Sequence, residues 1–308
     1  MSMPAPGNQL PERGRTAADR PVSLMRTDAR TIAFETIAEA VAQAAIDAAR
    51  VLPDDVLAAL RRARAEETSP VAREILDSLI ENARIARDER MPLCQDTGLA
   101  VFFVRLGAEA RVSGGLLTDA LNEGVRRGYQ RGFLRKSVLG DPLRRVNTGD
   151  NTPAVIHFEP VPGDELTIDF LAKGGGAENM SRAAGLTPAQ GRRGVIDFAV
   201  ETVRAAGASP CPPVVVGVGI GGTLEKAAIL AKRALLRPLG EPNADPDLKG
   251  LEQDLLREIN ALGIGPQGFG GDTTALGVHV EAFPCHIASL LVAVNIECHS
   301  HRSRRIRL

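Results

Sequence analysis

Three of the four cysteines in this chain lie where a thiol is available for chemistry. Cys94, Cys211 and Cys298 occur in the polar, loop-like segments PLCQDTG, SPCPP and NIECHSH. A proline beside a thiol fixes the backbone and removes an N–H donor. Cys285 lies in FPCHIA, where the neighbouring His286 is of more interest than the sulfur. Because cysteine is among the most often buried residue types, inert core packing is the alternative for each thiol.

The spacing of the cysteines limits the kind of metal site that they would form. They are far apart in the sequence and include no C-x-x-C pair, which disfavours a zinc ribbon or a ferredoxin-type cluster. Three thiolates from distant segments can hold three corners of a cubane iron–sulfur cluster. The fourth iron would then be open to substrate, like the open position of a catalytic zinc. Spacing alone leaves both the cluster and inert packing open.

A glycine-rich segment, Gly217–Gly222, satisfies G-x-G-x-x-G between an expected strand and an expected helix. This pattern is typical of dinucleotide binding, with a phosphate at the helix N-terminus. The acidic residue expected about 20 positions further on is replaced by the basic run Lys232–Arg237. We therefore favour a tight strand-to-helix turn over a nucleotide site, and an NAD-dependent dehydrogenase is a minor alternative.

Composition excludes several classes of protein. The 308 residues carry a formal net charge of −1, with 3% aromatic residues and no tryptophan, which argues against nucleic-acid binding. The longest apolar runs, such as Val214–Gly222, are shorter than the ~20 residues of a membrane helix. Four cysteines are too few for a disulfide scaffold, and no signal peptide is recognisable. These features predict a cytoplasmic protein with free thiols and no membrane association.

The chain must position these residues with a mixture of helices and strands. We expect a flexible tail over residues 1–28 and one domain over residues 29–308. Helical periodicity and capping signals predict three helices between Ala29 and Arg90. After Gly98, strand-like runs such as Leu99–Leu106 alternate with further helices. The predicted fold class is α/β (mixed α+β), in which a helical N-terminal layer precedes mixed strands and helices around the cluster-binding site.

Longer segments resemble a known family. They are MPLCQDTGLAVFFV, RRVNTGDNTPAVIH, AKGGGAENMSR, CPPVVVGVGIGGTLEKAA, LGIGPQGFGG and HIASLLVAVNIECH. In this order they resemble the class I, iron–sulfur-dependent fumarate hydratases, over nearly everything from Thr31 to His299. The resemblance is best to the α subunit of the two-subunit form, and a tartrate dehydratase α subunit is the nearest relative. The glycine block KGGGAENMS resembles the fumarase version, which favours fumarase.

The resemblance implies a cofactor and a set of site residues. It implies that Cys94, Cys211 and Cys298 hold a [4Fe-4S] cluster, whose open iron acts as a Lewis acid in the reversible dehydration of (S)-malate to fumarate. The implied catalytic residues are Asp96 and His286, and the implied substrate-binding residues are Gln95, Arg135 and Gly175. From the residues alone, the alternatives are a turn cap for Asp96, a solvated surface residue for Arg135 and a structural role for His286.

The resemblance also implies a partner. In single-chain members, a C-terminal half supplies further arginines, a lysine and the proton-abstracting threonine. We expect a separate fumarate hydratase β subunit to supply the base here, in a dimer of αβ pairs that takes a small dicarboxylate. The alternatives are a tartrate dehydratase α subunit and an iron–sulfur sensor without catalysis. His299 and His301 are expected to be surface polar residues, and the basic segment Arg302–Leu308 has no predicted function.

Overall fold

The computed structural model describes residues 29–308, and the predicted tail over residues 1–28 lies outside them. The helices are α1 (Phe34–Arg50), α2 (Asp54–Glu66), α3 (Pro70–Asp88), α4 (Leu117–Arg131), α5 (Gly175–Glu178), α6 (Gly191–Ala206), α7 (Leu224–Ala234) and α8 (Pro246–Asn260). The strands are β1 (Arg30–Ala33), β2 (Leu99–Gly107), β3 (Ala110–Ser113), β4 (Leu139–Asp141), β5 (Val146–Asn147), β6 (Val155–Val161), β7 (Leu166–Lys173), β8 (Arg182–Leu186), β9 (Val214–Gly221), β10 (Ala275–Phe283), β11 (Leu290–Glu297) and β12 (Ser303–Arg307). Two short 3₁₀ turns, at Pro188–Gln190 and Pro266–Gly268, complete the regular elements.

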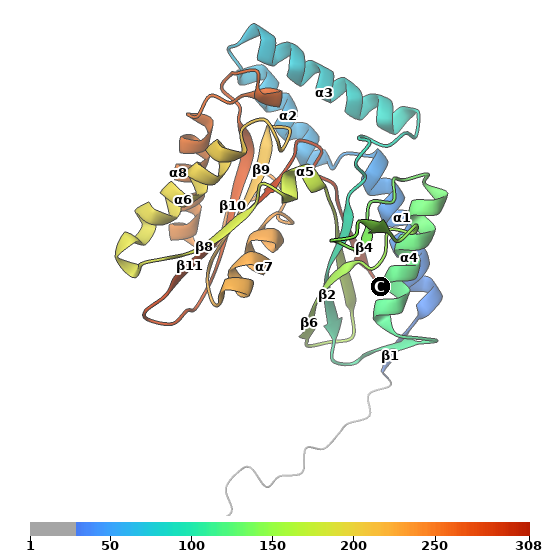
Figure 1. Ribbon diagram of the computed structural model, residues 1–308. Coiled ribbons are helices and arrows are strands. Elements are labelled where there is room, and N and C mark those ends of the chain that lie inside the picture. Colours follow the sequence, from blue (N-terminus) through green and yellow to red (C-terminus); the bar gives the residue numbers. More distant parts are fainter. Residues whose placement is uncertain (1–28) are drawn as a thin grey trace, which may run out of the picture.

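One four-stranded sheet has the order β12-β7-β2-β6 and forms the right-hand part of Figure 1. Strands β12 and β2 both pair antiparallel with β7, and β6 pairs parallel with β2. Helices α1 and α4 cover one face of this sheet. Their apolar stripes and the alternate sheet residues form one core, with Ile37, Val41, Phe102, Tyr129 and Phe170 among its buried members. This amphipathic pattern is what the spacing in the first helix predicts.

The second sheet has the order β10-β9-β11-β8, and it forms the left-hand part of Figure 1. Helices α6 and α8 cover one face, and α7 packs on the other. The G-x-G-x-x-G segment is the end of β9. A Cβ at Gly217 or at Gly219 would lie 2.0 Å from a carbonyl oxygen of α7. These two glycines therefore let a helix pack against the strand, and Gly221 and Gly222, with φ of +86° and +65°, form the favoured strand-to-helix turn.

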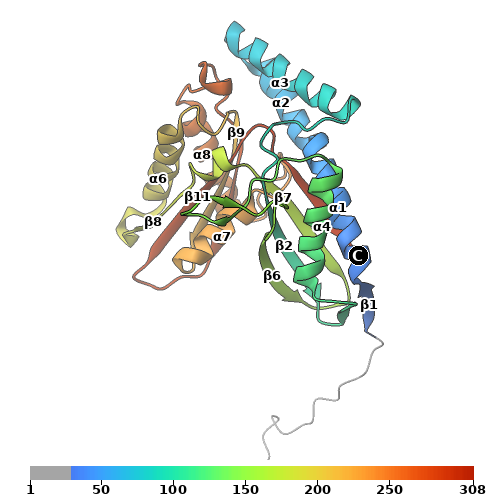
Figure 2. The same cartoon turned by 45° about the vertical axis from the view of Figure 1, so that its right-hand side comes forward.

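A third core joins the two sheets. It contains residues from the α2–α3 hairpin, from the second face of the first sheet (Val101, Phe103) and from the end of α7 (Leu235). Figure 2 shows the two sheets diverging from this junction, with α3 across the top and α7 between them. The segments of Cys94, Cys211 and Cys298 lie near the junction, where β7 and β11 end.

The structure confirms the predicted α/β class and the three N-terminal helices. Strand β12 was not predicted from the basic segment Ser303–Arg307, whose alternate residues face solvent and the end of α1. Within residues 29–308, no helix is both long and apolar enough to span a membrane.

Candidate functional site

The Cys94 segment lies between α3 and β2. The backbone at the start of this segment is fixed because the Leu93 amide donates a hydrogen bond to the Ala49 carbonyl at 2.8 Å. The Cys94 thiol lies 3.2 Å from Oε1 of Gln95 and donates to it. The next residue, Asp96, accepts a hydrogen bond from the Gly98 amide at Oδ1 (3.0 Å). Asp96 thus closes the turn that leads from Cys94 into β2.

The same carboxylate holds the glycine block that follows β7. Oδ2 of Asp96 accepts a hydrogen bond from the Gly175 amide at 2.8 Å. The end of β7 packs closely against Gly98, which has a φ of +84°. A Cβ added to Gly98 would lie 2.7 Å from the carbonyl carbon of Ala172. Only glycine fits there. Asp96 therefore caps the turn, as the alternative to a catalytic role predicts. The same carboxylate joins two segments that carry predicted site residues.

Cys211 lies in the connection between α6 and β9, with a positive φ of 54°. A Cβ on Gly176 would lie 3.5 Å from the carbonyl oxygen of Ser209, so the glycine block is next to this connection. The pKa of the Cys211 thiol is raised, mainly by burial and in addition by the charge of Cys94. The glycine block therefore lies against both the Cys94 segment, through Asp96 and Gly175, and the Cys211 segment, through Gly176 and Ser209.

Cys298 directly follows β11 and lies beside Cys211. The backbone amide of His299 donates to the Cys211 carbonyl at 3.3 Å, and His299 Nδ1 lies 3.0 Å from the same oxygen. The pKa of the Cys298 thiol is raised by burial and by the charge of Glu297, which outweigh the opposite effect of Arg302. All three predicted cluster cysteines therefore come from segments that pack on one another.

The residues after Cys298 turn into the interior. Ser300, His301 and Arg302 are buried, and His301 Nε2 lies 2.8 Å from the Leu235 carbonyl oxygen at the end of α7. The expectation that His301 is a surface residue is wrong, since it is 3% exposed and burial lowers the pKa of its imidazole, whereas His299 is half-buried. Arg302 Nη1 donates to the Asp96 carbonyl oxygen at 2.5 Å. No pattern in the sequence singles out Arg302.

A buried ion pair lies behind the cysteines. Lys173 and Glu297, which end β7 and β11, are 1% and 0% exposed, and Lys173 Nζ lies 3.4 Å from Glu297 Oε2. The ammonium also donates to the Ile296 carbonyl at 2.7 Å and lies 3.5 Å from Glu178. Burial works to raise the pKa of Glu178, but Lys173 and Lys232 outweigh it, and the pKa is lowered. Because Lys173 directly precedes the glycine block and Glu297 directly precedes Cys298, this pair joins the two sheets at the site.

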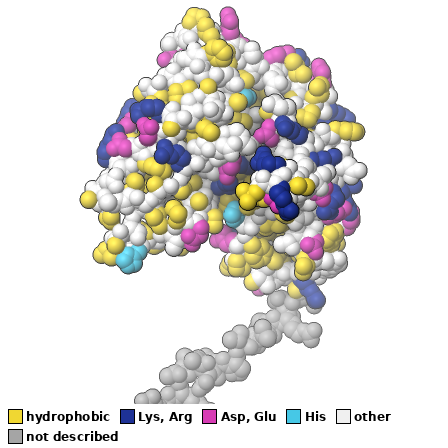
Figure 3. Space-filling model, in the orientation of Figure 1, with side chains coloured by type: hydrophobic (Ala, Val, Ile, Leu, Met, Phe, Trp, Pro, Cys, Tyr) yellow, Lys and Arg dark blue, Asp and Glu magenta, His cyan; other side chains and the backbone are white. Residues whose placement is uncertain are grey.

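Arg135 is brought close to the Cys94 segment through its backbone. Its carbonyl oxygen accepts a hydrogen bond from the Thr97 hydroxyl at 3.0 Å, and its side chain is exposed. The β4–β5 hairpin follows, with Leu143 92% exposed at its turn. Figure 3 shows basic and hydrophobic side chains together over this part of the surface. The guanidinium is therefore free to approach a ligand at this face.

His286 is placed elsewhere. It lies on the exposed turn between β10 and β11, where its Nδ1 accepts the Ala288 amide at 3.1 Å. Cys298 follows the opposite end of β11, an eight-residue strand, which spans roughly 25 Å. Cys285 shares the exposed turn, and its thiol donates to the Ser289 carbonyl at 3.4 Å. The structure thus separates His286 and Cys285 from the three other cysteines within one chain.

The grouped residues suit an iron–sulfur cluster better than a single metal ion. In the described part of the chain, no group of three His, Cys, Asp or Glu side chains is arranged to hold one ion. A cubane is larger than an ion, so its ligands lie further apart, and cysteine thiolates are its usual ligands. The buried guanidinium of Arg302 lies near the thiols, where it favours an anionic group. The donor set therefore fits a cluster.

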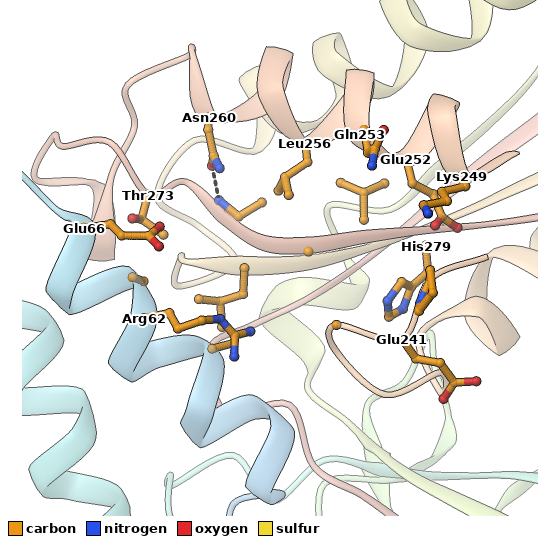
Figure 4. A pocket seen from close by; sticks show the side chains of 18 residues that line it. Arg62, Glu66, Glu241, Lys249, Glu252, Gln253, Leu256, Asn260, Thr273 and His279 are labelled. Carbon is orange, nitrogen blue, oxygen red and sulfur yellow. Dashed lines mark hydrogen bonds between the residues drawn. The ribbon is translucent and has the colours of Figure 1, made fainter. Parts of the chain in front are cut away.

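Two cavities lie away from the thiols and contain none of the predicted site residues. A cavity of about 880 Å³ between the sheets is lined by arginines that are already paired, such as Arg233 with Glu281 at 2.7 Å. A second, of about 420 Å³, lies between α2, α8 and the edge strand β10 (Figure 4). His279 lines it and is 4% exposed, and burial lowers the pKa of its imidazole to about 4.

The chain matches known proteins over most of its length. Residues 38–307 match the model of the family described as fumarate hydratase (Fumerase). The chain belongs to this family. It is 41% identical over 280 residues to a Methanocaldococcus jannaschii protein provisionally named L(+)-tartrate dehydratase subunit alpha, covering 88% of this chain and 98% of the relative. It is 35% identical over 255 residues to the L(+)-tartrate dehydratase subunit alpha of Escherichia coli (strain K12), covering 82% and 84%. The chain is therefore a hydro-lyase subunit of the Fumerase family.

Proposed function

We propose that the chain is the α subunit of an iron–sulfur hydro-lyase that interconverts (S)-malate with fumarate and water. The convergence of the Cys94, Cys211 and Cys298 segments beside a buried arginine carries this proposal. A [4Fe-4S] cluster on these thiols would supply a Lewis acid for the leaving hydroxyl group. The four cysteines are free thiols, which fits a reducing compartment such as the cytoplasm.

The residues around the thiols have distinct tasks in this proposal. Exposed Arg135 binds a substrate carboxylate, for which its planar, two-pronged guanidinium is suited. Gln95 and Gly175 border the same face and contact the bound dicarboxylate. Asp96 is held at both carboxylate oxygens by backbone amides, at 3.0 and 2.8 Å. It is therefore oriented in advance to position the group that takes the carbon-bound proton.

The base comes from a partner in this proposal. Dehydration of malate removes a proton from carbon and a hydroxyl group from the neighbouring carbon, which leaves as water. Several relatives are named as α subunits, and a β subunit would cover the cysteine face and supply the base, in a dimer of αβ pairs. We keep His286 as a predicted catalytic residue that acts on a site of another chain, since its turn is distant from the thiols of its own chain.

L(+)-tartrate is the second candidate substrate. The relatives above carry the tartrate dehydratase name, whereas the family model carries the fumarate hydratase name. The two substrates differ by one hydroxyl group. A site that hydrogen-bonds this hydroxyl discriminates strongly against a substrate without it, because buried polar groups are then left unpaired. A direct comparison of turnover therefore separates the two candidates.

The test uses the full chain, purified without oxygen, reconstituted with iron and sulfide and mixed with its β partner. Fumarate absorbance is followed with (S)-malate, and product formation with each tartrate stereoisomer. We expect malate turnover that is lost in Cys211→Ser and kept in Cys285→Ser. Turnover of tartrate alone would change the substrate and keep the mechanism. A stable cluster spectrum without turnover of any of these acids would favour the sensor.

A further inference from the structure

Arg302 is a buried cation that no carboxylate of residues 29–308 pairs with. Its side chain is 1% exposed, and it lies directly before β12. On the same segment, Arg305 pairs with Asp169 at 2.5 Å, whereas Arg302 forms no ion pair with any carboxylate of residues 29–308. Its Nε has no hydrogen-bond partner in that part of the chain. A buried charge is costly unless it is paired, so this guanidinium needs an explanation.

The guanidinium faces the cysteine site from within. Nη1 donates to the carbonyl oxygen of Asp96 at 2.5 Å, and the Arg302 backbone carbonyl accepts the Ala172 amide at 3.0 Å. A Cβ added to Gly174 would lie 3.6 Å from Nη2 and 3.5 Å from Oδ2 of Asp96. Arg302 thus borders the space in front of the glycine block. It also contacts Asp96, which follows Cys94 by two residues in the sequence.

The charge of the site accounts for this placement. Three thiolates that hold an iron–sulfur cluster make an anionic group, and a dicarboxylate adds further negative charge. A buried guanidinium beside them offsets this charge without moving when substrate binds. The neighbouring buried cation, Lys173, is already paired with Glu297 at 3.4 Å and with Glu178 at 3.5 Å. Of the buried cations in the described part of the chain, Arg302 is therefore the one whose charge is available to the site.

We propose that Arg302 is the charge partner of the anionic cluster and, through the Asp96 carbonyl, a positioning residue for the Cys94 loop. This role rests on the proposed function. It requires that the positive charge of Arg302, and not only its hydrogen bond, affects the cluster. Arg302→Gln removes the charge and keeps a donor, whereas Arg302→Lys keeps the charge and loses the planar shape. Arg307→Gln, on the exposed side of β12, is the matched control for a lost arginine.

The four full-length proteins are reconstituted anaerobically, and two properties are measured: the reduction potential of the cluster and the rate of iron loss to a chelator. We expect Arg302→Gln to shift the potential to a more negative value, since a lost positive charge disfavours the added electron. We expect iron loss to become about tenfold faster, the lower end of the effect of removing a residue that supports metal ligands. Arg302→Lys should keep the wild-type potential, and Arg307→Gln should keep both properties.

Each other result contradicts part of the account. Equal potentials for wild type and Arg302→Gln would overturn the charge role, whatever the rate of iron loss. Equal rates of iron loss for all four proteins would overturn the positioning role. If Arg302→Gln fails to fold, Arg302→Lys decides the charge role. A reduction potential that differs from that of wild type would overturn this role, and the wild-type potential would support it. Failure of the wild-type chain to assemble any cluster would instead overturn the proposed function.

Discussion

Two buried glutamates differ in how the structure stabilises their negative charge. Glu67, at the corner between α2 and α3, is 0% exposed, and its carboxylate accepts backbone amides of Thr68, Ser69, Asp272 and Thr273 at 2.9–3.1 Å. Glu297, beside Cys298, is also 0% exposed, but neither of its oxygens has a hydrogen-bond partner in the described part of the chain. Among residues 29–308, its only ion pair is with Lys173, at 3.4 Å.

The difference separates a structural carboxylate from one beside a reactive site. Backbone amides replace the hydration of Glu67, so this residue fixes a corner and has little freedom. The Lys173–Glu297 pair balances charge between two strand ends but leaves hydrogen-bonding capacity unused. Most of the unpartnered buried side-chain atoms of residues 29–308 belong to β11 and the segment after it, namely to Asn295, Glu297, His301 and Arg302, and the others are the Nε atoms of Arg50 and Arg237. We infer that unsatisfied buried charge marks the functional end of the molecule, and the following changes test this comparison.

The largest loss of stability is expected at the satisfied carboxylate. Glu67→Ala leaves several buried amides without an acceptor, each of which is costly, and it should lower the free energy of unfolding by about 4 kcal/mol. Urea unfolding measures this. Glu66→Ala, at the exposed neighbouring position, is the control and should unfold like wild type. A loss at Glu67 no greater than that at Glu66 would remove the distinction on which the comparison depends.

The Lys173–Glu297 pair should behave differently, because the loss of stability on removing one charge can be reversed by removing the other. Lys173→Met leaves Glu297 buried and unpaired, which should lower the free energy of unfolding by about 3 kcal/mol. The double variant with Glu297→Leu removes both charges and should recover most of this loss. No second substitution can restore Glu67→Ala in this way, since its partners are backbone amides. Additive losses in the double variant would show that the pair is not a compensated charge.

Low pH should destabilise the fold through buried histidines that contact the end of α7. His279 and His301 contact the carbonyl oxygens of Ala234 and Leu235 at 3.1 and 2.8 Å, and the pKa of His279 is lowered from 6.5 to about 4 by burial. Between these values the unfolded chain binds more protons than the folded chain, so stability falls as the pH falls. The loss due to His279 is about 2 kcal/mol from pH 7 to pH 5.

Urea unfolding of wild type and His279→Gln at both pH values checks this prediction. The variant should lose about 2 kcal/mol less than wild type over this range. His286→Gln, on the exposed turn, serves as the control and should lose as much as wild type. An equal acid response in all three proteins would exclude His279 as a source of acid sensitivity.

The smallest change in stability is expected at Gly174. Its φ is not positive, and an added Cβ would make only ordinary contacts, 3.5 and 3.6 Å from Asp96 and Arg302. Gly174→Ala should therefore change the free energy of unfolding by less than about 0.5 kcal/mol. The methyl group would nevertheless fill the space between these two side chains and should weaken turnover in the reconstituted enzyme. Gly98→Ala, at a positive φ and with a 2.7 Å contact, should destabilise strongly. Equal turnover in Gly174→Ala and wild type would show that this space is not used.

Local patterns in the sequence were enough for some features and not for others. The apolar stripe from Phe34 to Ala48 predicts the first helix, because helix periodicity is a local property. The three loop cysteines could be singled out because their neighbours are polar and proline-rich. The pairing of Lys173 with Glu297, and of Arg302 with Asp96, depends on strands that are distant in the sequence. Nothing local distinguishes a charge that will be buried from one that will face solvent.

The position of His286 shows the same limit. The family resemblance implies a site shared with Cys298, but an extended strand between the two residues separates them in space. Strand β12 shows the opposite case. Its basic residues do not resemble a strand, yet pairing with β7 carries Arg302 into the interior. In both cases the tertiary arrangement of strands decides which residues meet.

The central claim is that Cys94, Cys211 and Cys298 hold one cluster. The most direct measurement is anaerobic reconstitution of the wild-type chain and of the four single cysteine-to-serine variants, followed by iron analysis and absorption and electron paramagnetic resonance spectra. We expect about four irons per chain in wild type and in Cys285→Ser. Each of the other three variants should lose the cluster or hold it with an altered spectrum. Loss of the cluster in Cys285→Ser, or an unaltered cluster in any of the other three variants, would contradict the account.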